Sequence, residues 1–254
     1  MKKRFAKAAV LAVGLVLAFG ATASGIEACI GPLCVSSTVD VQPRELPAKG
    51  NAPITLSSIT RIKDKGGAPP TLDAIDFLVD KHGTVNSKAF PVCPPAKLEG
   101  ATVSQARKRC AGALVGKGTG KALVTMPGAA PFQITSPVSF FNAPPQGGKP
   151  TLIGHAYETV PTPQALLLPI AIERVAKGRY GYRVRVEMPE VAGGYGAPTL
   201  AEASIGATLK RDGKKIGYIN AHCSGGRMQV EGTLSFTNGD RFPTTLTSPC
   251  HSPG

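Results

Sequence analysis

Residues 180–188 read "YGYRVRVEM", and the alternation within this stretch decides the fold class. The even-numbered positions carry large side chains that are mostly apolar: Tyr180, Tyr182, Val184, Val186 and Met188. The odd-numbered positions carry glycine or charge: Gly181, Arg183, Arg185 and Glu187. Because successive side chains of a β-strand point to opposite faces, the stretch predicts a strand with one buried face and one wet face.

The same pattern recurs along the chain, in "TLDAIDFLVD" (71–80) and "MQVEGTLSF" (228–236). Gly and Pro clusters separate such runs, and the chain has 30 glycines and 23 prolines. Further strands are expected near 36–42, 53–62, 119–126, 131–141, 150–158, 165–173, 204–211 and 214–222. About ten short strands with little helix are typical of a β-sandwich. We therefore predict an all-β protein with a β-sandwich fold.

The stretch "SFTNGDRF" near the C-terminus predicts a hairpin, since Asn238-Gly239 is a strong turn signal. A two-residue loop would place Phe236 opposite Arg241 on one face. A three-residue loop instead pairs Phe236 with Phe242. We favour the second register, because the buried face of a strand fixes its pairing.

The first 25 residues, "MKKRFAKAAVLAVGLVLAFGATASG", have the features of a secretory signal peptide. A basic leader precedes the apolar run 8–19, and Ala21-Thr22-Ala23 supplies the small-x-small cleavage pattern. The run is shorter than the roughly 20 residues that a membrane span needs. We predict that residues 1–23 are a signal peptide and that the mature chain has no transmembrane segment. The protein is expected to be secreted or located in the cell envelope.

The mature chain, residues 24–254, is expected to form a single domain. The Pro- and Gly-rich stretch "NAPPQGGKP" at 142–150 leaves open an alternative, in which two β subdomains divide there.

All six cysteines follow the predicted cleavage site, and an even number in an exported chain indicates three disulfides. We favour the pairing between sequence neighbours, which is Cys29–Cys34, Cys93–Cys110 and Cys223–Cys250. A lipid anchor on Cys29 is the alternative. It would leave Cys34 without a partner, and Glu27 suits an acylation signal poorly.

The stretch "FPVCPPAKLEGATVSQARKRCAG" (90–112) predicts one short helix, at about 102–110. Thr102 and Gln105 have the spacing of a capping box. A bond between Cys93 and Cys110 would staple this helix to the end of a strand. The two cysteines lie too far apart for a zinc motif, and the chain has no C-x-x-C redox motif.

Just downstream, "GALVGKGTGK" misses the spacing of a phosphate-binding loop in both possible registers. We interpret it as a glycine-rich approach to a strand. Together with the absence of zinc and redox motifs, this leads us to expect no metal and no cofactor.

The stretch "FPVCPPAKLEGATVSQARKRCAGALVGKGTGKA" resembles a segment of uncharacterised secreted proteins of high-GC actinobacteria. The shared pattern is V-x-C-P followed by K-L-x-G-x-[TS]-x-x-Q-A-x-x-x-C. The late stretch "EGTLSFTNGDRF" before Cys250 also matches. The resemblance covers most of the mature chain, and it implies no known activity, ligand or catalytic residue.

The chain is strongly basic, with 29 Lys and Arg against 16 Asp and Glu. Four of the basic residues lie in the signal peptide, so the mature chain keeps a net charge of +9. Four cations share one face of an extended strand: Lys177, Arg179, Arg183 and Arg185. They form either a solvated outer face balanced by nearby acids or a contact surface for anionic envelope polymers or lipid head groups. No nucleic-acid-binding motif is present.

The sequence offers no catalytic motif. The segment "HCSGG" (222–226) places Ser224 beside a cysteine rather than on a nucleophile elbow, and the four histidines are scattered. We therefore expect a non-catalytic exported protein that binds a partner or has a structural role. Two alternatives remain open, a carrier of an apolar ligand and a hydrolase with a dispersed active site. A large apolar cavity would favour the carrier, and converging titratable groups would favour the enzyme.

Overall fold

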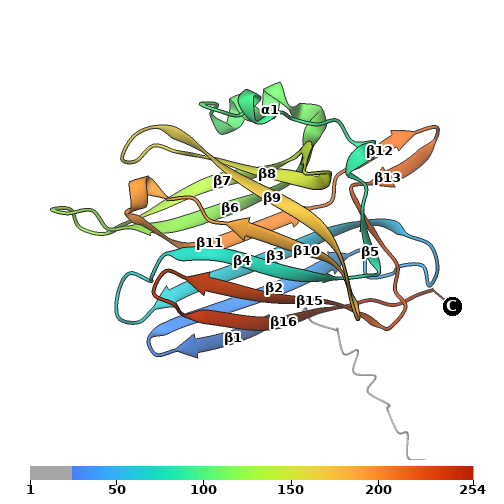
Figure 1. Cartoon of the computed structure of the whole chain (residues 1–254), viewed down its shortest axis with the longest axis horizontal. Helices are drawn as coiled ribbons and strands as arrows, with labels where there is room; N and C mark the ends of the chain where they lie inside the picture. The colour runs from blue at the N-terminus through green and yellow to red at the C-terminus, as the bar shows by residue number, and fades with distance from the viewer. Residues whose placement is uncertain (1–24, 254) are drawn as a thin grey trace, which may run out of the picture.

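The computed structural model describes residues 25–253, so the predicted signal peptide lies outside the described residues. Sixteen strands and one short α-helix form the described chain (Figure 1), which is therefore all-β as predicted. Four 3₁₀ turns complete it, at Ser87–Ala89, Pro95–Lys97, Ala111–Ala113 and Ala192–Gly194. In this part of the chain no helix is long and apolar enough to cross a membrane.

One antiparallel sheet contains fourteen of the strands. Its main path runs β1 (Gly25–Ile30), β2 (Leu33–Gln42), β3 (Ala52–Asp64), β11 (Gly196–Ile205), β6 (Leu114–Val124), β7 (Phe132–Gln146), β8 (Lys149–Glu158), β9 (Gln164–Lys177), β10 (Tyr180–Glu187), β4 (Leu72–Asp80), β15 (Arg227–Phe236) and β16 (Arg241–Pro249). Beside this path, β14 (Ile219–Ala221) joins β3 to β5 (Gly83–Val85). A separate hairpin consists of β12 (Thr208–Arg211) and β13 (Lys214–Gly217).

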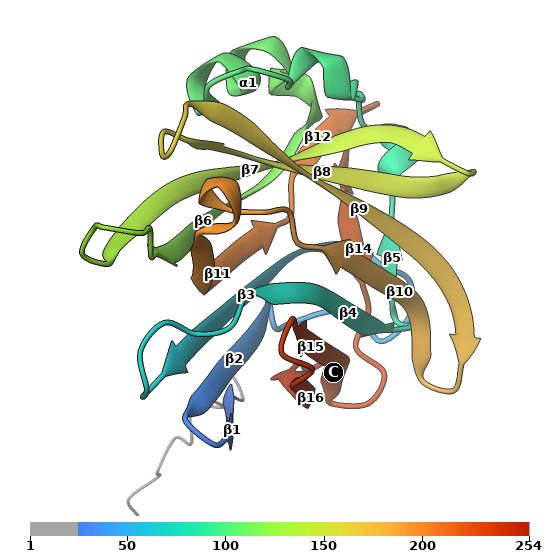
Figure 2. The ribbon, with the colours of Figure 1, turned by 60° about the vertical axis from the view of Figure 1, so that its left-hand side comes forward.

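The two ends of this path meet, so that the sheet is nearly closed and barrel-like (Figure 2). The amide of Val41 in β2 donates to Ser248 Oγ in β16 at 2.9 Å. Just beyond these strands, the amide of Leu46 donates to the carbonyl of His251, and that of His251 to the carbonyl of Arg44, both at 2.9 Å. The last strand therefore packs beside the second one.

The predicted sandwich of about ten strands is not confirmed, because the structure has sixteen strands and a barrel-like sheet. The alternation of apolar and polar residues does not distinguish a sandwich from a barrel. Period-two patterning shows that one face of a strand is buried, whether that face packs on a second sheet or on the far side of its own sheet. Strand β10 illustrates this, since Tyr182 and Val186 are buried while Arg183 and Arg185 are exposed.

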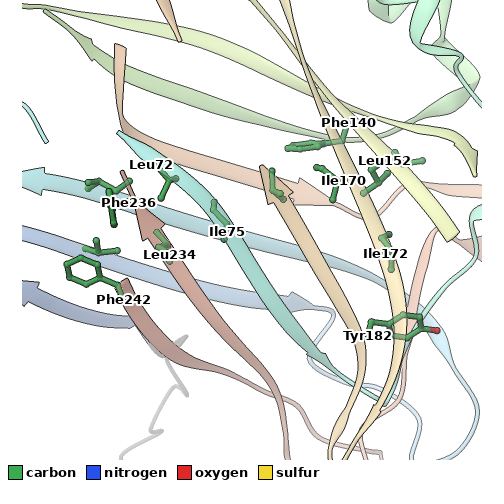
Figure 3. Packing of buried hydrophobic residues seen from close by; sticks show 14 of the residues in the cluster. Leu72, Ile75, Phe140, Leu152, Ile170, Ile172, Tyr182, Leu234, Phe236 and Phe242 are labelled. Atoms are coloured by element: carbon green, nitrogen blue, oxygen red, sulfur yellow. The ribbon is translucent and has the colours of Figure 1, made fainter. Parts of the chain in front are cut away.

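The buried faces of many strands form one main core inside the sheet (Figure 3). Its labelled members come from β4, β7, β8, β9, β10, β15 and β16: Leu72, Ile75, Phe140, Leu152, Ile170, Ile172, Tyr182, Leu234, Phe236 and Phe242. Because the core draws on strands from both halves of the chain, it depends on closure of the sheet.

The helix α1 (Val103–Arg109) lies against the outside of the sheet, over β7 and β8 (Figure 1). Its capping box is confirmed, because Thr102 Oγ1 accepts the amide of Gln105 and Gln105 Oε1 accepts the amide of Thr102. The predicted staple is also present as the disulfide Cys93–Cys110. Ala106 is fully buried beneath the helix, in a small core next to the staple.

The glycines of "GALVGKGTGK" lie in and just before β6, where they allow close contact with β11. A Cβ atom on Gly118 would lie 1.9 Å from the carbonyl oxygen of Glu202, and one on Gly116 would lie 2.7 Å from that of Ser204. These glycines are thus needed for strand packing, as the interpretation of a glycine-rich approach to a strand anticipates.

The predicted register of the C-terminal hairpin is wrong by two residues. Phe242 faces Leu234, and the amide of Phe236 instead donates to the carbonyl of Asp240 at 3.0 Å. The side chains of Asn238 and Asp240 bond to each other within the turn and support the observed register. The rings of Phe236 and Phe242 still pack edge to face, with centroids 5.6 Å apart, because the two registers bury the same faces.

The predicted strands 204–211 and 214–222 are each divided in two. The chain leaves the sheet after β11 and passes close to β3 at Gly206, where a Cβ would lie 2.3 Å from Thr55 Oγ1. Asp212 and Gly213 then adopt positive φ angles of 52° and 74°, the geometry of a tight hairpin turn. The stretch 142–150 lies in another hairpin, comprising the end of β7, the turn at 147–148 and the start of β8.

Candidate functional site

The interior of the barrel-like sheet contains a cavity of about 350 Å³. Nearly every strand of the sheet contributes to its wall. Figure 3 labels side chains of the core that line it, among them Ile75, Phe140, Leu152 and Ile170. The volume falls within the range of small-molecule sites, which is about 300–1,000 Å³.

The alternation noted in the sequence produces this apolar wall. From β10 the cavity receives Tyr182, Val184 and Val186, and from β9 it receives Leu168 and Ile170. In each strand these residues are two apart, so they share the inward face. The sequence thus predicts which side chains point inward, although it does not reveal that they surround a space.

Two features leave the interior unfilled. An eight-stranded barrel is just wide enough for side chains to fill, and the path from β2 round to β16 has more strands than eight. In addition, β6 and β11 present small residues to the cavity, namely Gly120, Ala122, Ala201 and Ala203. A wide ring with small side chains on one wall gives an open centre.

Few charged residues line the cavity, and in the described lining these are Lys121, Glu158 and Glu202. Glu158 is buried with both oxygens bonded, one to the amide of Ala192 at 2.8 Å and the other to the side chain of Gln164. Both carboxylate oxygens of Glu158 therefore already have partners within the protein.

Two hydroxyl groups of the wall differ from each other. Tyr218 is fully buried, its OH donates to Asn142 Oδ1 at 3.2 Å, and burial raises its pKa above the usual range. Thr244 Oγ1 is buried and has no hydrogen-bond partner among the described residues. Since buried polar groups are normally bonded, the Thr244 hydroxyl is available to a polar group of a ligand.

The four cations predicted to share one face lie around the β9–β10 turn and along the outside of β10. Arg183 donates through Nε to both carboxylate oxygens of Asp76, and these bonds raise its pKa. Arg185 Nε lies 3.4 Å from Glu187, and Arg179 donates to Asp80 at 3.0 Å. Each of the three arginines thus faces a carboxylate, while Lys177 is the last residue of β9.

The three disulfides join the cysteine pairs expected from their spacing: Cys29–Cys34, Cys93–Cys110 and Cys223–Cys250. Glu27 lies close enough to Cys29 and Cys34 for the three to resemble a metal-binding group. Both sulfurs are bonded to each other, however, so no thiolate is present to bind a metal.

The four histidines, scattered in sequence, have different environments. His155 is fully buried, its Nε2 lies 2.9 Å from the carbonyl of Ala101, and desolvation lowers its pKa. The rings of His82 and His222 lie side by side, with centroids 4.8 Å apart. The backbone of His251 forms a parallel β-bridge with Glu45 where the two ends of the sheet meet. Sequence reasoning missed the pairing of His82 with His222, because strand pairing and not sequence spacing brings them together.

Comparison with known proteins gives no relative from which a function could be inferred. The chain matches no family model and no curated protein, and no solved structure matches it. Its function must therefore be inferred from the cavity and the polar groups described above.

Proposed function

We propose that this protein binds a small apolar molecule inside its barrel-like sheet and acts as an extracellular or envelope carrier. The observation that carries the proposal is the cavity of about 350 Å³ with its mainly apolar wall. For comparison, an engineered apolar cavity of about 150 Å³ stays dry and binds benzene. A larger apolar space offers room for a longer hydrocarbon ligand.

The energetics favour such a ligand. Each methylene group transferred from water to an apolar site contributes about 0.8 kcal/mol. A polar head group can in addition bond the unpartnered Thr244 hydroxyl, which removes the cost of leaving that group unsatisfied. The preferred ligand is thus a hydrocarbon with one small polar group, such as a long-chain alcohol or fatty acid.

Export to the cell exterior is part of the proposal. Three disulfides suit an oxidising compartment, and the predicted signal peptide and the resemblance to secreted actinobacterial proteins support export. The sulfur of Cys29 is bonded to the sulfur of Cys34, which argues against a lipid anchor on Cys29.

Binding is tested with the neutral fluorescent probe N-phenyl-1-naphthylamine and the mature chain. We expect its fluorescence to rise on binding and to fall when decanol displaces it. The variant Val184→Trp fills the cavity and should weaken probe binding at least tenfold. Arg185→Trp is the control, because Arg185 lies on the same strand with its side chain exposed. A probe signal equal in both variants would exclude the cavity as the site.

A second proposal concerns the basic face formed by Lys177, Arg179, Arg183 and Arg185. The excess of positive charge and the side-chain exposure of Arg183 and Arg185, 46% and 53%, support contact with an anionic envelope surface. Their carboxylate partners reduce the net charge of the face, so this contact is expected to be weak and sensitive to salt.

A further inference from the structure

Three polar residues meet at the end of the sheet where β5 lies, on the right in Figure 1. Asp80 is the last residue of β4, His82 lies in the turn before β5, and Ser224 lies between β14 and β15. Pairing of β4 with β15 and of β5 with β14 brings these segments together. The amide of His222 also donates to the carbonyl of His82 at 3.2 Å, which fixes the second segment beside the first.

The three side chains form a continuous hydrogen-bonded chain. His82 Nδ1 lies 2.7 Å from Asp80 Oδ1, and His82 Nε2 lies 2.8 Å from Ser224 Oγ. With Nδ1–H donating to the carboxylate, Nε2 carries the lone pair that accepts the hydroxyl proton of Ser224. This is the arrangement of a nucleophilic serine, a general base and an orienting carboxylate.

Asp80 is held firmly on the side away from the histidine. Its side chain is only 1% exposed, and Oδ2 accepts from Arg179 at 3.0 Å and from the amide of Gln229 at 3.3 Å. The amide of His82 donates to Oδ1 at 3.1 Å. The guanidinium balances the buried negative charge, so the carboxylate can orient His82.

Ser224 combines a fixed backbone with an accessible hydroxyl. Cys223, which precedes it, is buried and bonded to Cys250, whereas Ser224 itself is exposed. A Cβ on Gly225 would meet no atom within 4 Å, so the chain is uncrowded at the residue after Ser224. Within residues 25–253 the amides of Gly225 and Gly226 donate to no acceptor, and they are available to a substrate oxygen.

The apolar cavity reaches the same end of the sheet. Gly83, directly after His82, lines it together with Val79. Both residues also line a small void of about 30 Å³ that extends to Asp80 and Met228. The cavity therefore comes within one residue of His82, so the acyl group of an ester can enter it at this end while the ester bond stays beside His82.

We propose that Ser224, His82 and Asp80 form a catalytic site that hydrolyses carboxylic esters. Ser224 is the nucleophile, His82 the general base, and Asp80 a positioning residue. The substrates are esters of small alcohols, with an apolar acyl group. Hydrolysis of short esters goes beyond the proposed function, whereas a preference for longer acyl groups rests on it.

The reaction proceeds in two balanced halves. Ser224 Oγ bonds to the ester carbonyl carbon while its proton passes to His82 Nε2; the carbon–oxygen bond to the alcohol then breaks, and the alcohol leaves with that proton. In the second half, water attacks the acyl carbon and gives one proton to His82. The bond from carbon to Ser224 Oγ breaks, the acid leaves, and the proton returns to Oγ.

A small organophosphate, diisopropyl fluorophosphate, tests the nucleophile without requiring the cavity. Attack by Ser224 Oγ on phosphorus expels fluoride and leaves a stable adduct, which peptide mass spectrometry locates. We expect the adduct on Ser224 in the mature chain and none in Ser224→Ala. The rate of labelling should fall by about 10²–10⁴-fold in His82→Gln, the usual contribution of a general base.

The matched control is Ser252→Ala, because Ser252 is exposed and its Oγ donates to the carbonyl of Cys223 at 3.3 Å. This variant should label and hydrolyse p-nitrophenyl butyrate like the parent. Labelling that is absent, lies on another residue, or keeps its rate in His82→Gln overturns the catalytic site. Labelling without N-phenyl-1-naphthylamine binding would overturn the carrier proposal alone.

The positioning role of Asp80 has its own readout. In Asp80→Asn the amide would donate to Nδ1 and place the proton on Nε2, which then accepts nothing from Ser224. We expect the pH profile of p-nitrophenyl butyrate hydrolysis to change its shape. A rate lowered by one constant factor at every pH would show that Asp80 is merely structural.

Discussion

At the scale of single residues, His155 couples stability to pH. It is fully buried, and desolvation lowers its pKa in the folded chain. In the unfolded chain it takes up a proton near its ordinary pKa of about 6.5. The unfolded state therefore binds more protons as the pH falls below this value, and the folded state loses stability there.

We expect the free energy of unfolding to fall by up to about 1.4 kcal/mol for each pH unit below about 6.5 on account of His155. His155→Gln keeps a donor for the carbonyl of Ala101 and removes this proton uptake. Urea titrations at pH 5, 6, 7 and 8 measure the two slopes. Equal slopes in the parent and the variant would contradict this role of His155.

Gly118 shows how one hydrogen atom in place of a side chain permits two strands to approach. Gly118→Ala would place a Cβ 1.9 Å from the backbone oxygen of Glu202, which cannot move without disturbing the sheet. We expect a loss of more than about 3 kcal/mol in stability. Gly120→Ala is the control, since its Cβ would meet Val138 at 3.8 Å, an ordinary contact. Thermal unfolding of both variants measures the difference, and similar melting temperatures would refute the argument.

At the scale of elements, the Cys93–Cys110 bond is expected to hold α1 in place. The helix has seven residues, too few to be stable alone. Replacing both cysteines with alanine should lower the stability by about 3 kcal/mol, as loop closure of this length predicts. Amide hydrogen exchange should accelerate over Val103–Arg109. Unchanged exchange there would show that packing on β7 and β8 suffices.

For the basic face, we predict that envelope binding depends on where the cations lie and not on the total charge of the protein. Replacing Lys177, Arg179, Arg183 and Arg185 with Gln should abolish salt-sensitive binding to isolated cell envelope. The β12–β13 hairpin provides a control with the same change in charge, through Gln at Lys210, Arg211, Lys214 and Lys215. Equal loss in both variants, or retained binding in the first, would contradict the proposed contact face.

The elements also show which parts of the structure were predictable. The alternation at 180–188, the capping box at Thr102 and the cysteine pairs are local patterns, and each is present as expected. The predicted register of the hairpin at Phe242 was wrong, because both registers bury the same face and the burial pattern does not distinguish them. The meeting of His82 with Ser224, 142 residues apart, depends on strand order, which no local pattern encodes.

At the scale of the whole molecule, closure of the sheet determines what the protein can do. The contact between β2 and β16 turns a row of half-buried strands into a ring, and small residues on β6 and β11 leave its centre open. The sequence predicted the inward side chains but neither the closure nor the cavity. Those depend on the number of strands and on pairing between residues as distant as Val41 and Ser248.

The central claim is that this interior binds a hydrocarbon chain, and isothermal titration calorimetry of residues 24–254 with unbranched alcohols tests it most directly. From hexanol to decanol, each added methylene should tighten binding about fourfold, which corresponds to about 0.8 kcal/mol. In Val184→Trp the affinity should stop rising at a shorter alcohol than in the parent protein, because the indole ring occupies part of the cavity. An affinity that does not depend on chain length, or the same series in Val184→Trp, would contradict the claim.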